Sequence, residues 1–354
     1  MRAHVRGMLE AAGPELALHL FLDERAPALP AELRDPRVHV HPVWGRVNAL
    51  SNVVSVTRRA DALGLDAVIY HNYVPPRARH ARIAFVHDVS FRPHPEYFTL
   101  VERAYFAPMR WLVPSADRIA TPSAHERERL IGYRYGAPER IDVVPHGVDP
   151  AFRPRSAWGD DELHAALARF DLPAEFMLFV GRLNVRKNVS TLLHALALTK
   201  SRAPLVVAGA PDWKTSNLVG EAARLGVADR VVFVGGVSAT ELAALYATAS
   251  VFCFPSFDEG FGLPPLEAMA SGCPVVSSNA ASLPEVCGDA GILVAPTDAK
   301  AMAVALDLVL ADERVRGKMR EAGLARASRF TLARSGRALL DVVHAAVAVP
   351  AGGA

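Results

Sequence analysis

Two glutamates, Glu259 and Glu267, stand eight residues apart in a stretch rich in glycine and proline. Gly260 and Gly262 favour a loop with positive φ that comes close to a ligand, because glycine has no Cβ atom. Two consecutive prolines then favour the start of a helix, which we expect over residues 266–271. One carboxylate would therefore lie on a loop and the other in the first turn of a helix.

The start of this expected helix has the chemistry of an anion site. Its free N–H groups would point at an anion, with the positive end of the helix dipole behind them. The two carboxylates would flank these donors and accept hydrogen bonds from hydroxyl groups. A sugar diphosphate has hydroxyls at both ends and phosphate between them, so it matches this arrangement. The alternative is an ordinary surface loop in which both glutamates are solvated.

A cationic loop follows the apolar run that ends at Gly181. Arg182 offers a planar fork of donors and Lys187 a compact point charge. Together they would neutralise a diphosphate and so favour its departure as a leaving group. Arg186, between them, is expected to be exposed. A solvated basic loop is the alternative interpretation.

His87 ends another apolar run. A side chain at the carboxyl end of a parallel strand faces the ligand crevice, which favours a functional role for this imidazole. The alternative is a packed structural histidine. Its neighbour Asp88 would point the other way along the strand, and His71 and His146 lack the same context.

The segment from Ser256 to Gly272, with the apolar strand that follows it, resembles the signature of the family 4 retaining glycosyltransferases. These are two-domain enzymes of the GT-B fold. The resemblance is specific from about Val180 to Pro296, and His87 supports it more weakly. It implies that the donor diphosphate and sugar are handled by His87, Glu259, Arg182 and Lys187. It also implies that Glu267 holds the ribose hydroxyls and that further donor contacts come from Gly260, Phe261, Gly262, Leu263, Leu266 and Val237.

The same resemblance implies a mechanism. The sugar is transferred on its front face with retention, and the departing phosphate oxygen takes the acceptor proton, so neither a metal ion nor a cofactor is expected. The residues around His87 slightly favour GDP-mannose as the donor over a UDP-sugar. The expected acceptor is a glycan or a lipid-linked acceptor, in the assembly of cell-surface polysaccharide.

The elements that position these residues form an α/β pattern, in which short apolar runs alternate with helical stretches. A chain of 354 residues, 51% of them hydrophobic, has material for two buried cores. We therefore expect two Rossmann-like domains that face each other across a cleft. Strands are expected at 16–22, 38–43, 67–70, 83–87, 118–120 and 141–144, then at 176–180, 205–208, 231–234, 251–254, 275–278 and 292–294. Helices are expected at 47–63, 97–113, 123–132, 189–199, 217–225, 239–247, 266–271 and 331–347.

The expected domain limits follow from this pattern. Residues 1–150 would form the acceptor-side domain, 151–170 a linker, and 171–330 the domain that binds the nucleotide sugar. Residues 331–354 would form a helix that crosses back to the first domain, and a tail. Residues 3–9 resemble the helix that follows the first Gly-rich loop of the family, so we expect the first strand and that loop to be missing from this sequence. The two strands beside the missing one would then lack backbone partners.

Composition excludes several classes of protein. A net charge of +2 argues against a nucleic-acid partner, and the three cysteines have no metal-ligand spacing. No secretory pattern and no apolar run of membrane-spanning length is found, which favours the cytoplasm. Peripheral membrane contact is suggested by a basic and apolar set, with a solvated helix face as the alternative. This set consists of Arg127, Arg129, Leu130, Ile131, Tyr133, Arg134 and Tyr135.

Other activities of similar architecture remain as alternatives. A dehydrogenase would need Gly-x-Gly-x-x-Gly after a strand, and no segment supplies it. An epimerase or phosphorylase of the same architecture is a second alternative. A catalytically inactive protein that binds nucleotide sugars is a third.

Overall fold

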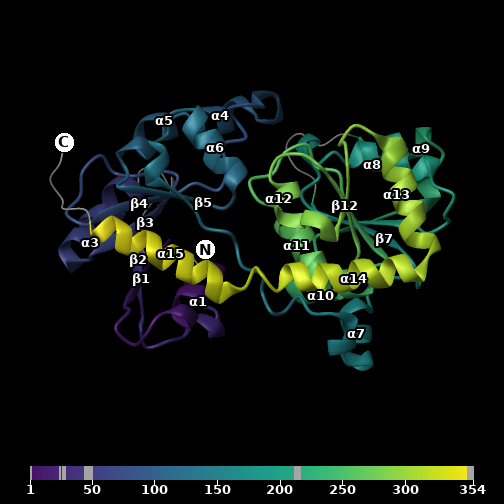
Figure 1. The fold of residues 1–354 in the computed structure, drawn as a ribbon, viewed down its shortest axis with the longest axis horizontal. Coiled ribbons are helices and arrows are strands. Elements are labelled where there is room, and N and C mark those ends of the chain that lie inside the picture. The colour runs from purple at the N-terminus through teal and green to yellow at the C-terminus, as the bar shows by residue number, and fades with distance from the viewer. Residues whose placement is uncertain (1, 24, 26–28, 44–50, 211–216, 349–354) are drawn as a thin grey trace. The chain divides into compact units, whose positions relative to one another are not determined.

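The computed structural model describes residues 2–23, 25, 29–43, 51–210 and 217–348. The chain divides into two compact units, each described by itself (Figure 1). Unit 1 comprises Met1–Pro93, Leu100–Gly147 and Phe330–Ala354. Unit 2 comprises His94–Thr99 and Val148–Arg329.

Unit 1 contains six strands and several helices among the described residues. Its strands are β1 (Leu18–Asp23), β2 (Val38–Val43), β3 (Ala67–His71), β4 (Ala81–Phe85), β5 (Arg118–Thr121) and β6 (Ile141–Val143). Its α-helices are α1 (Arg2–Ala11), α3 (Thr57–Leu63), α4 (Leu100–Phe106), α5 (Met109–Leu112), α6 (Ala124–Gly132) and α15 (Leu332–Val347).

The strands of unit 1 form two separate parallel sheets. One has the order β3-β4-β5-β6, and the other is the pair β1-β2. Within the described part of the chain, β1 pairs with β2 alone and β3 with β4 alone. A shared apolar core joins these elements to the helices, since Met8 of α1, Phe85 of β4 and Leu339 of α15 belong to one buried cluster.

Helix α15 belongs to unit 1 although it follows unit 2 in the sequence, as expected for a helix that crosses back. It packs along α1 (Figure 1). The two backbones approach so closely that a Cβ atom at Gly7 would lie 2.1 Å from the Leu332 carbonyl oxygen. A Cβ atom at Gly336 would lie 1.9 Å from the carbonyl carbon of Gly7. Only glycine therefore fits at these two positions.

Unit 2 contains one six-stranded parallel sheet with helices in the connections. Its strands are β7 (Met177–Val180), β8 (Leu205–Ala208), β9 (Val231–Gly235), β10 (Val251–Phe254), β11 (Val275–Ser278) and β12 (Ile292–Val294). Its α-helices are α7 (Asp160–Leu167), α8 (Val189–Leu198), α9 (Leu218–Arg224), α10 (Ala239–Thr248), α11 (Leu263–Ala270), α12 (Leu283–Cys287), α13 (Ala299–Ala311) and α14 (Glu313–Ala327).

The strand order in unit 2 is β12-β11-β10-β7-β8-β9. The chain begins at β7 in the middle, builds β8 and β9 on one side, and returns to place β10 on the other side. The order therefore reverses between β7 and β10, whose carboxyl ends are neighbours. In open parallel sheets such a switch point is where ligands bind.

The expectation of an α/β fold with parallel sheets is confirmed, and each expected strand overlaps an observed one. The helix expected over 97–113 is divided into α4 and α5. Pro108 lies at the division, and proline has no N–H to continue the hydrogen bonds of a helix. Of the helix expected over 47–63, residues 47–50 lie outside the described part. The stretch 151–170, which we expected to be a linker, contains helix α7, and this helix packs on α10.

Candidate active site

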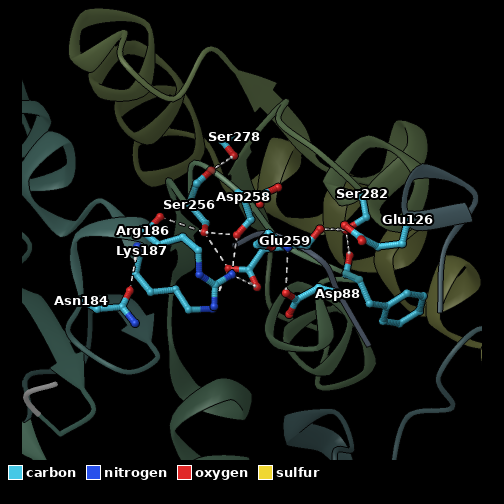
Figure 2. A network of polar contacts seen from close by, with 12 residues as sticks. Asp88, Glu126, Asn184, Arg186, Lys187, Ser256, Asp258, Glu259, Ser278 and Ser282 are labelled. Carbon is cyan, nitrogen blue, oxygen red and sulfur yellow. Dashed lines mark hydrogen bonds and ion pairs between the residues drawn. The ribbon is translucent and has the colours of Figure 1, made fainter. Parts of the chain in front are cut away.

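The loops that follow β7 and β10 meet at the switch point of unit 2. Lys187 Nζ donates a hydrogen bond to Glu259 Oε1 over 2.6 Å (Figure 2). Arg186 Nη1 donates to the Asp258 carbonyl oxygen over 2.6 Å and lies 3.3 Å from Glu259 Oε2. Two cations of the first loop therefore hold the carboxylate of the second. The expectation that Arg186 is exposed is wrong, because its side chain turns toward this carboxylate and is only 20% exposed.

Serine hydroxyls fix the conformation of the Glu259 loop. Ser256 Oγ donates to Glu259 Oε1 over 2.6 Å, and Ser278 Oγ donates to the Ser256 carbonyl oxygen over 2.5 Å. Ser282 Oγ contacts the carbonyl oxygens of Glu259 and Phe261 at 2.8 and 2.6 Å. The carboxylate and the backbone of its loop are thus held in one arrangement (Figure 2).

The charge state of Glu259 follows from its neighbours. Burial opposes its ionisation, but the charges of Lys187 and Arg186 and the hydrogen bonds outweigh burial, so the pKa of Glu259 is lowered. Glu259 is therefore an ionised hydrogen-bond acceptor at neutral pH. Lys187 compensates its charge, and Arg186 adds a further positive charge.

Arg182 lies on the same loop as Lys187, directly after Gly181, and is exposed. Asn184 stabilises the turn between them, because its side chain accepts a hydrogen bond from the Lys187 N–H. Asn188 then adopts a left-handed conformation with φ of 56° and donates to the carbonyl oxygens of Pro255 and Pro296. These bonds tie the cationic loop to the strand ends beside it.

Helix α11 begins at Leu263, three residues earlier than expected. Gly262 precedes it with φ of 119°, as expected for this loop, whereas Gly260 does not adopt positive φ. Both prolines lie inside the first turn, which tolerates proline because its N–H groups have no partner within the helix. Leu266 donates its N–H to the Gly262 carbonyl oxygen over 3.3 Å, so the prediction of a free amide at Leu266 is wrong. Within the first three residues of the helix, only Leu263 has an N–H group.

Glu267 consequently lies in the second turn of α11, and the expected first-turn position is wrong. Its Oε2 accepts a hydrogen bond from the hydroxyl of Tyr246 over 3.2 Å. Burial raises the pKa of Glu267 to about 7, the Tyr246 hydrogen bond works in the opposite direction, and the charge of Asp149 adds to the rise. No local pattern singles out Tyr246, which lies on α10 and is fully buried.

Val237 lies between β9 and α10 and is half-buried. Gly235 before it adopts positive φ, with a value of 69°. Ser238 after it forms a capping box with Glu241 at the start of α10. The backbone around Val237 is therefore a turn of defined shape at the carboxyl end of β9.

In unit 1, His87 belongs to a histidine cluster that consists of the buried His4 and the half-buried His71, His87 and His146. His71 ends β3 and His87 follows β4; because these strands are parallel neighbours, the two rings meet, with His71 Nδ1 3.1 Å from His87 Nε2. His146 Nδ1 lies 3.1 Å from His4 Nε2, and the rings of His87 and His146 are 5.5 Å apart. The prediction that His71 and His146 are separate from the context of His87 is wrong.

The histidine cluster is neutral. Burial, reinforced by the neighbouring imidazoles, lowers the pKa of His87 to about 3. The pKa of His71 falls to about 4, and those of His4 and His146 to about 3, again mainly through burial. In the pair of His71 and His87, one nitrogen therefore donates and the other accepts.

The basic and apolar set expected to contact a membrane is partly internal. Leu130 and Tyr135 are buried. Arg129 pairs with Glu126 at 2.8 Å, and Arg127 donates to the Ile141 carbonyl oxygen over 2.9 Å. Tyr133 and Arg134 of the same set are exposed, so contact of this set with a membrane stays a prediction.

Among the helices that the structure describes, none has the length and apolarity needed to cross a bilayer. Among the described residues, no group of three or more histidine, cysteine, aspartate or glutamate side chains is arranged to hold a metal ion.

Comparison with known proteins identifies the family. Residues 162–326 match the family described as Glycosyl transferases group 1, and residues 4–152 match Glycosyltransferase Family 4. The chain is 36% identical to the O-antigen chain mannosyltransferase B of Escherichia coli over 276 residues, covering 74% of this chain and 70% of that protein. It is 35% identical to the D-inositol 3-phosphate glycosyltransferase of Mycolicibacterium gilvum, covering 67% of this chain but about half, 54%, of that protein.

Solved structures share the fold. Sucrose-phosphate synthase from Thermosynechococcus elongatus matches with a TM-score of 0.77 and 22% identity, covering 96% of this chain and 91% of that chain. The Anabaena protein HepE, in complex with UDP and glucose, matches with a TM-score of 0.72 and 18% identity, covering 96% and 95%. The resemblance seen in the sequence is thus confirmed: the chain belongs to the group 1, family 4 glycosyltransferases and is a glycosyltransferase of the GT-B fold.

Proposed function

We propose that this glycosyltransferase transfers a sugar from a nucleotide-diphosphate sugar to an acceptor hydroxyl with retention of configuration. The observation that carries the proposal is the contact of Lys187 and Arg186 with Glu259 at the switch point of unit 2. The two loops at this point contain three cations against two carboxylates, Asp258 and Glu259. The resulting positive charge suits a diphosphate, and the fixed carboxylate suits a sugar hydroxyl.

The proposed roles follow from these charges. Arg182 and Lys187 neutralise the charge that develops on the departing diphosphate. Glu259 accepts hydrogen bonds from the hydroxyls of the donor sugar, an orientation that its contacts with Lys187 and Ser256 fix in advance. His87, as a neutral imidazole, is proposed to contact the donor sugar. The departing phosphate oxygen takes the acceptor proton, so no separate base is required.

The nucleotide is proposed to bind along α11. Glu267, oriented by Tyr246, would accept hydrogen bonds from the two ribose hydroxyls. The backbone of residues 260–263 would approach the sugar and the phosphates, where Gly262 removes the obstruction of a side chain. The turn at Val237 would contact the base through its backbone.

The donor is proposed to be GDP-mannose, and the acceptor a glycan or a lipid-linked glycan of the cell surface, with the chain in the cytoplasm. The mannosyltransferase from Escherichia coli supports this choice, since its name concerns the O-antigen chain. UDP-sugars are the competing donors, because the structure of HepE contains UDP and glucose.

Release of free nucleotide by the purified chain, measured with GDP- and UDP-sugars, tests the proposal. Arg182→Ala and Lys187→Ala are expected to lower kcat strongly, and Glu267→Ala to weaken donor binding. Arg224→Ala serves as the matched control, because this side chain is 74% exposed on α9. Unchanged donor kinetics in all three site variants would reject these roles. Donor binding without any release would favour an inactive protein that binds nucleotide sugars. Product of inverted configuration would reject retention.

A further inference from the structure

The imidazole ring of His87 is held by a hydrogen bond from a neighbouring strand. His71 ends β3 and lies opposite Phe85 of β4 in the register of the two strands. His71 Nδ1 lies 3.1 Å from His87 Nε2, and the planes of the two rings differ by only 13°. Since both rings are neutral, an N–H of one donates to the lone pair of the other. The bond engages Nε2 of His87 and leaves Nδ1 as the ring nitrogen for a ligand.

The backbone on both sides of His87 is fixed by buried side chains. Just before His87, the Thr121 hydroxyl donates to the Val86 carbonyl oxygen over 3.0 Å. Just after it, the Glu126 carboxylate accepts a hydrogen bond from the Val89 N–H over 3.0 Å. Thr121 and Glu126 are both fully buried. With the backbone held in this way, His87 keeps the rotation of its own ring, and the bond with His71 restricts that rotation.

His71 itself stands on a firmly held part of unit 1. β3 continues to His71, and the chain then turns at Asn72, which adopts a left-handed conformation with φ of 64°. The Tyr73 N–H closes this turn with a hydrogen bond to the His71 carbonyl oxygen over 2.7 Å, and Tyr73 is fully buried. An imidazole fixed in this way at a strand end can hold its neighbour in one orientation.

We propose that His71 is a positioning residue for the transfer reaction, and that its hydrogen bond fixes the ring orientation and the tautomer of His87. The hydrogen bond that one ring nitrogen makes decides which nitrogen carries the proton, and therefore what the other nitrogen offers to a ligand. His71 thus presents Nδ1 of His87 to the donor sugar with one hydrogen-bonding character. The inference rests on the proposed function, in which His87 contacts that sugar. A contact that is misplaced by a small distance lowers the rate of the chemical step, and His71 prevents such a misplacement.

Packing and positioning demand different side chains at residue 71. His146 and Phe85 also contact the His87 ring, with ring centroids 5.5 and 4.8 Å away, but ring contacts of this kind do not select a tautomer. Phenylalanine at position 71 keeps an aromatic ring of similar size and removes the hydrogen bond. Asparagine places its side-chain amide where the imidazole has Nδ1, so it keeps a hydrogen-bonding group at that point. A packing role therefore predicts that His71→Phe is the milder change, whereas a positioning role predicts that His71→Asn is.

Kinetics and nuclear magnetic resonance on the full chain test the proposal. Nucleotide release from GDP-mannose and from UDP-glucose is measured for His71→Phe, His71→Asn, His87→Ala and the double variant of His71→Phe with His87→Ala. The ¹⁵N shifts of the His87 ring report its tautomer without any donor. His41→Phe is the matched control, because His41 Nε2 lies 2.9 Å from His19 Nδ1 in another histidine pair of unit 1. Thermal unfolding checks that each variant is folded.

His71→Phe is expected to lower kcat roughly tenfold and to leave the KM for the donor nearly unchanged, since the nucleotide is proposed to bind in unit 2. His71→Asn should recover most of the loss, and His41→Phe should match the unaltered chain. In the His87→Ala background, His71→Phe should cost nothing further, because it acts through His87. The His87 ring should show one neutral tautomer in the unaltered chain and a mixture in His71→Phe.

An unchanged His87 tautomer in His71→Phe, or an equal loss of kcat from His71→Phe in the His87→Ala background, would overturn the proposal. Similar losses in His71→Phe and His71→Asn, with lowered unfolding temperatures in both, would also overturn it, in favour of a structural role. A changed tautomer together with full activity of His87→Ala would support the effect of the hydrogen bond and reject the contact of His87 with the donor sugar. Failure of the proposed function is thereby told apart from failure of this inference.

Discussion

Replacing Glu267 by glutamine is expected to stabilise the protein at neutral and higher pH, but not at acid pH. Glutamine keeps an oxygen that can accept the hydrogen bond from Tyr246 but removes the carboxyl group that ionises. Burial raises the pKa of Glu267 from 4.5 to about 7 in the folded chain. Between these two values, the folded chain holds a proton that the unfolded chain has lost. The stability of the unaltered protein therefore falls as pH rises through this range.

The size of the effect follows from the same two values. Each pKa unit corresponds to 1.36 kcal/mol, so the rise from 4.5 to about 7 amounts to about 3 kcal/mol. At pH 4.5 the carboxyl is neutral in the folded state and half ionised in the unfolded state, so the variant should nearly match the unaltered chain, and well below this pH the two should match. Above about pH 7, the variant should be more stable by about 2–3 kcal/mol.

Urea unfolding followed by circular dichroism, repeated from pH 4.5 to about pH 8, measures this difference. Glu321→Gln is the matched control, because Glu321 is exposed on α14. The control should leave the unfolding free energy nearly unchanged at every pH. A difference between the Glu267→Gln variant and the unaltered chain that does not change with pH would refute the reasoning. It would mean that Glu267 has an ordinary pKa in the folded protein.

Three further predictions concern other contacts. Lys187→Met should lower the unfolding free energy by about 3 kcal/mol, since it removes the nearer of the two cations that hold the buried Glu259 carboxylate, and adding Glu259→Gln should restore most of the loss. Urea unfolding of both variants measures this, and equal stability of the two would contradict it. Gly336→Ala should lower the thermal unfolding temperature, whereas Gly317→Ala on α14, where a Cβ meets nothing within 4 Å, should not. The histidine cluster should remain neutral in nuclear magnetic resonance titrations until the pH approaches 4, where His71 begins to titrate, and its lowered pKa values should reduce stability as pH falls below 6.5. Ordinary titration near pH 6.5 would contradict these lowered pKa values.

The strands could be predicted from the sequence because their apolar runs are short, buried and separated by turn residues. β7 and β10 are examples. Nearly all of their residues are buried inside a parallel sheet, so the sequence of each strand is continuously apolar and does not alternate between apolar and polar residues. The sequence also predicted that the loops after β7 and β10 contain the residues of the candidate active site. The paired prolines misled the prediction of α11, because proline suits both a loop and the first turn of a helix.

Partners across the fold could not be predicted from local rules. Tyr246 and Glu267 are 21 residues apart, and nothing in either segment indicates that α10 and α11 bring them together. The pattern of the cationic loop alone predicts an exposed Arg186, whereas its partner Asp258 lies on the loop after β10. Strand order decides which loops meet, and strand order is a property of the whole unit. The contact between His71 and His87 has the same origin, in the pairing of β3 with β4.

The place of α15 in unit 1 has a consequence for protein synthesis. A ribosome completes residues 148–329, which form most of unit 2, before it reaches α15. At about 5–20 residues per second, the roughly 200 residues between Gly147 and Val347 take roughly 10–40 s. During that interval the newly made unit 1 lacks Leu339 and Leu340, so the apolar side chains that α15 covers stay open to water and to chaperones. The whole of unit 2 is therefore synthesised before the last helix of unit 1, although unit 1 is begun first.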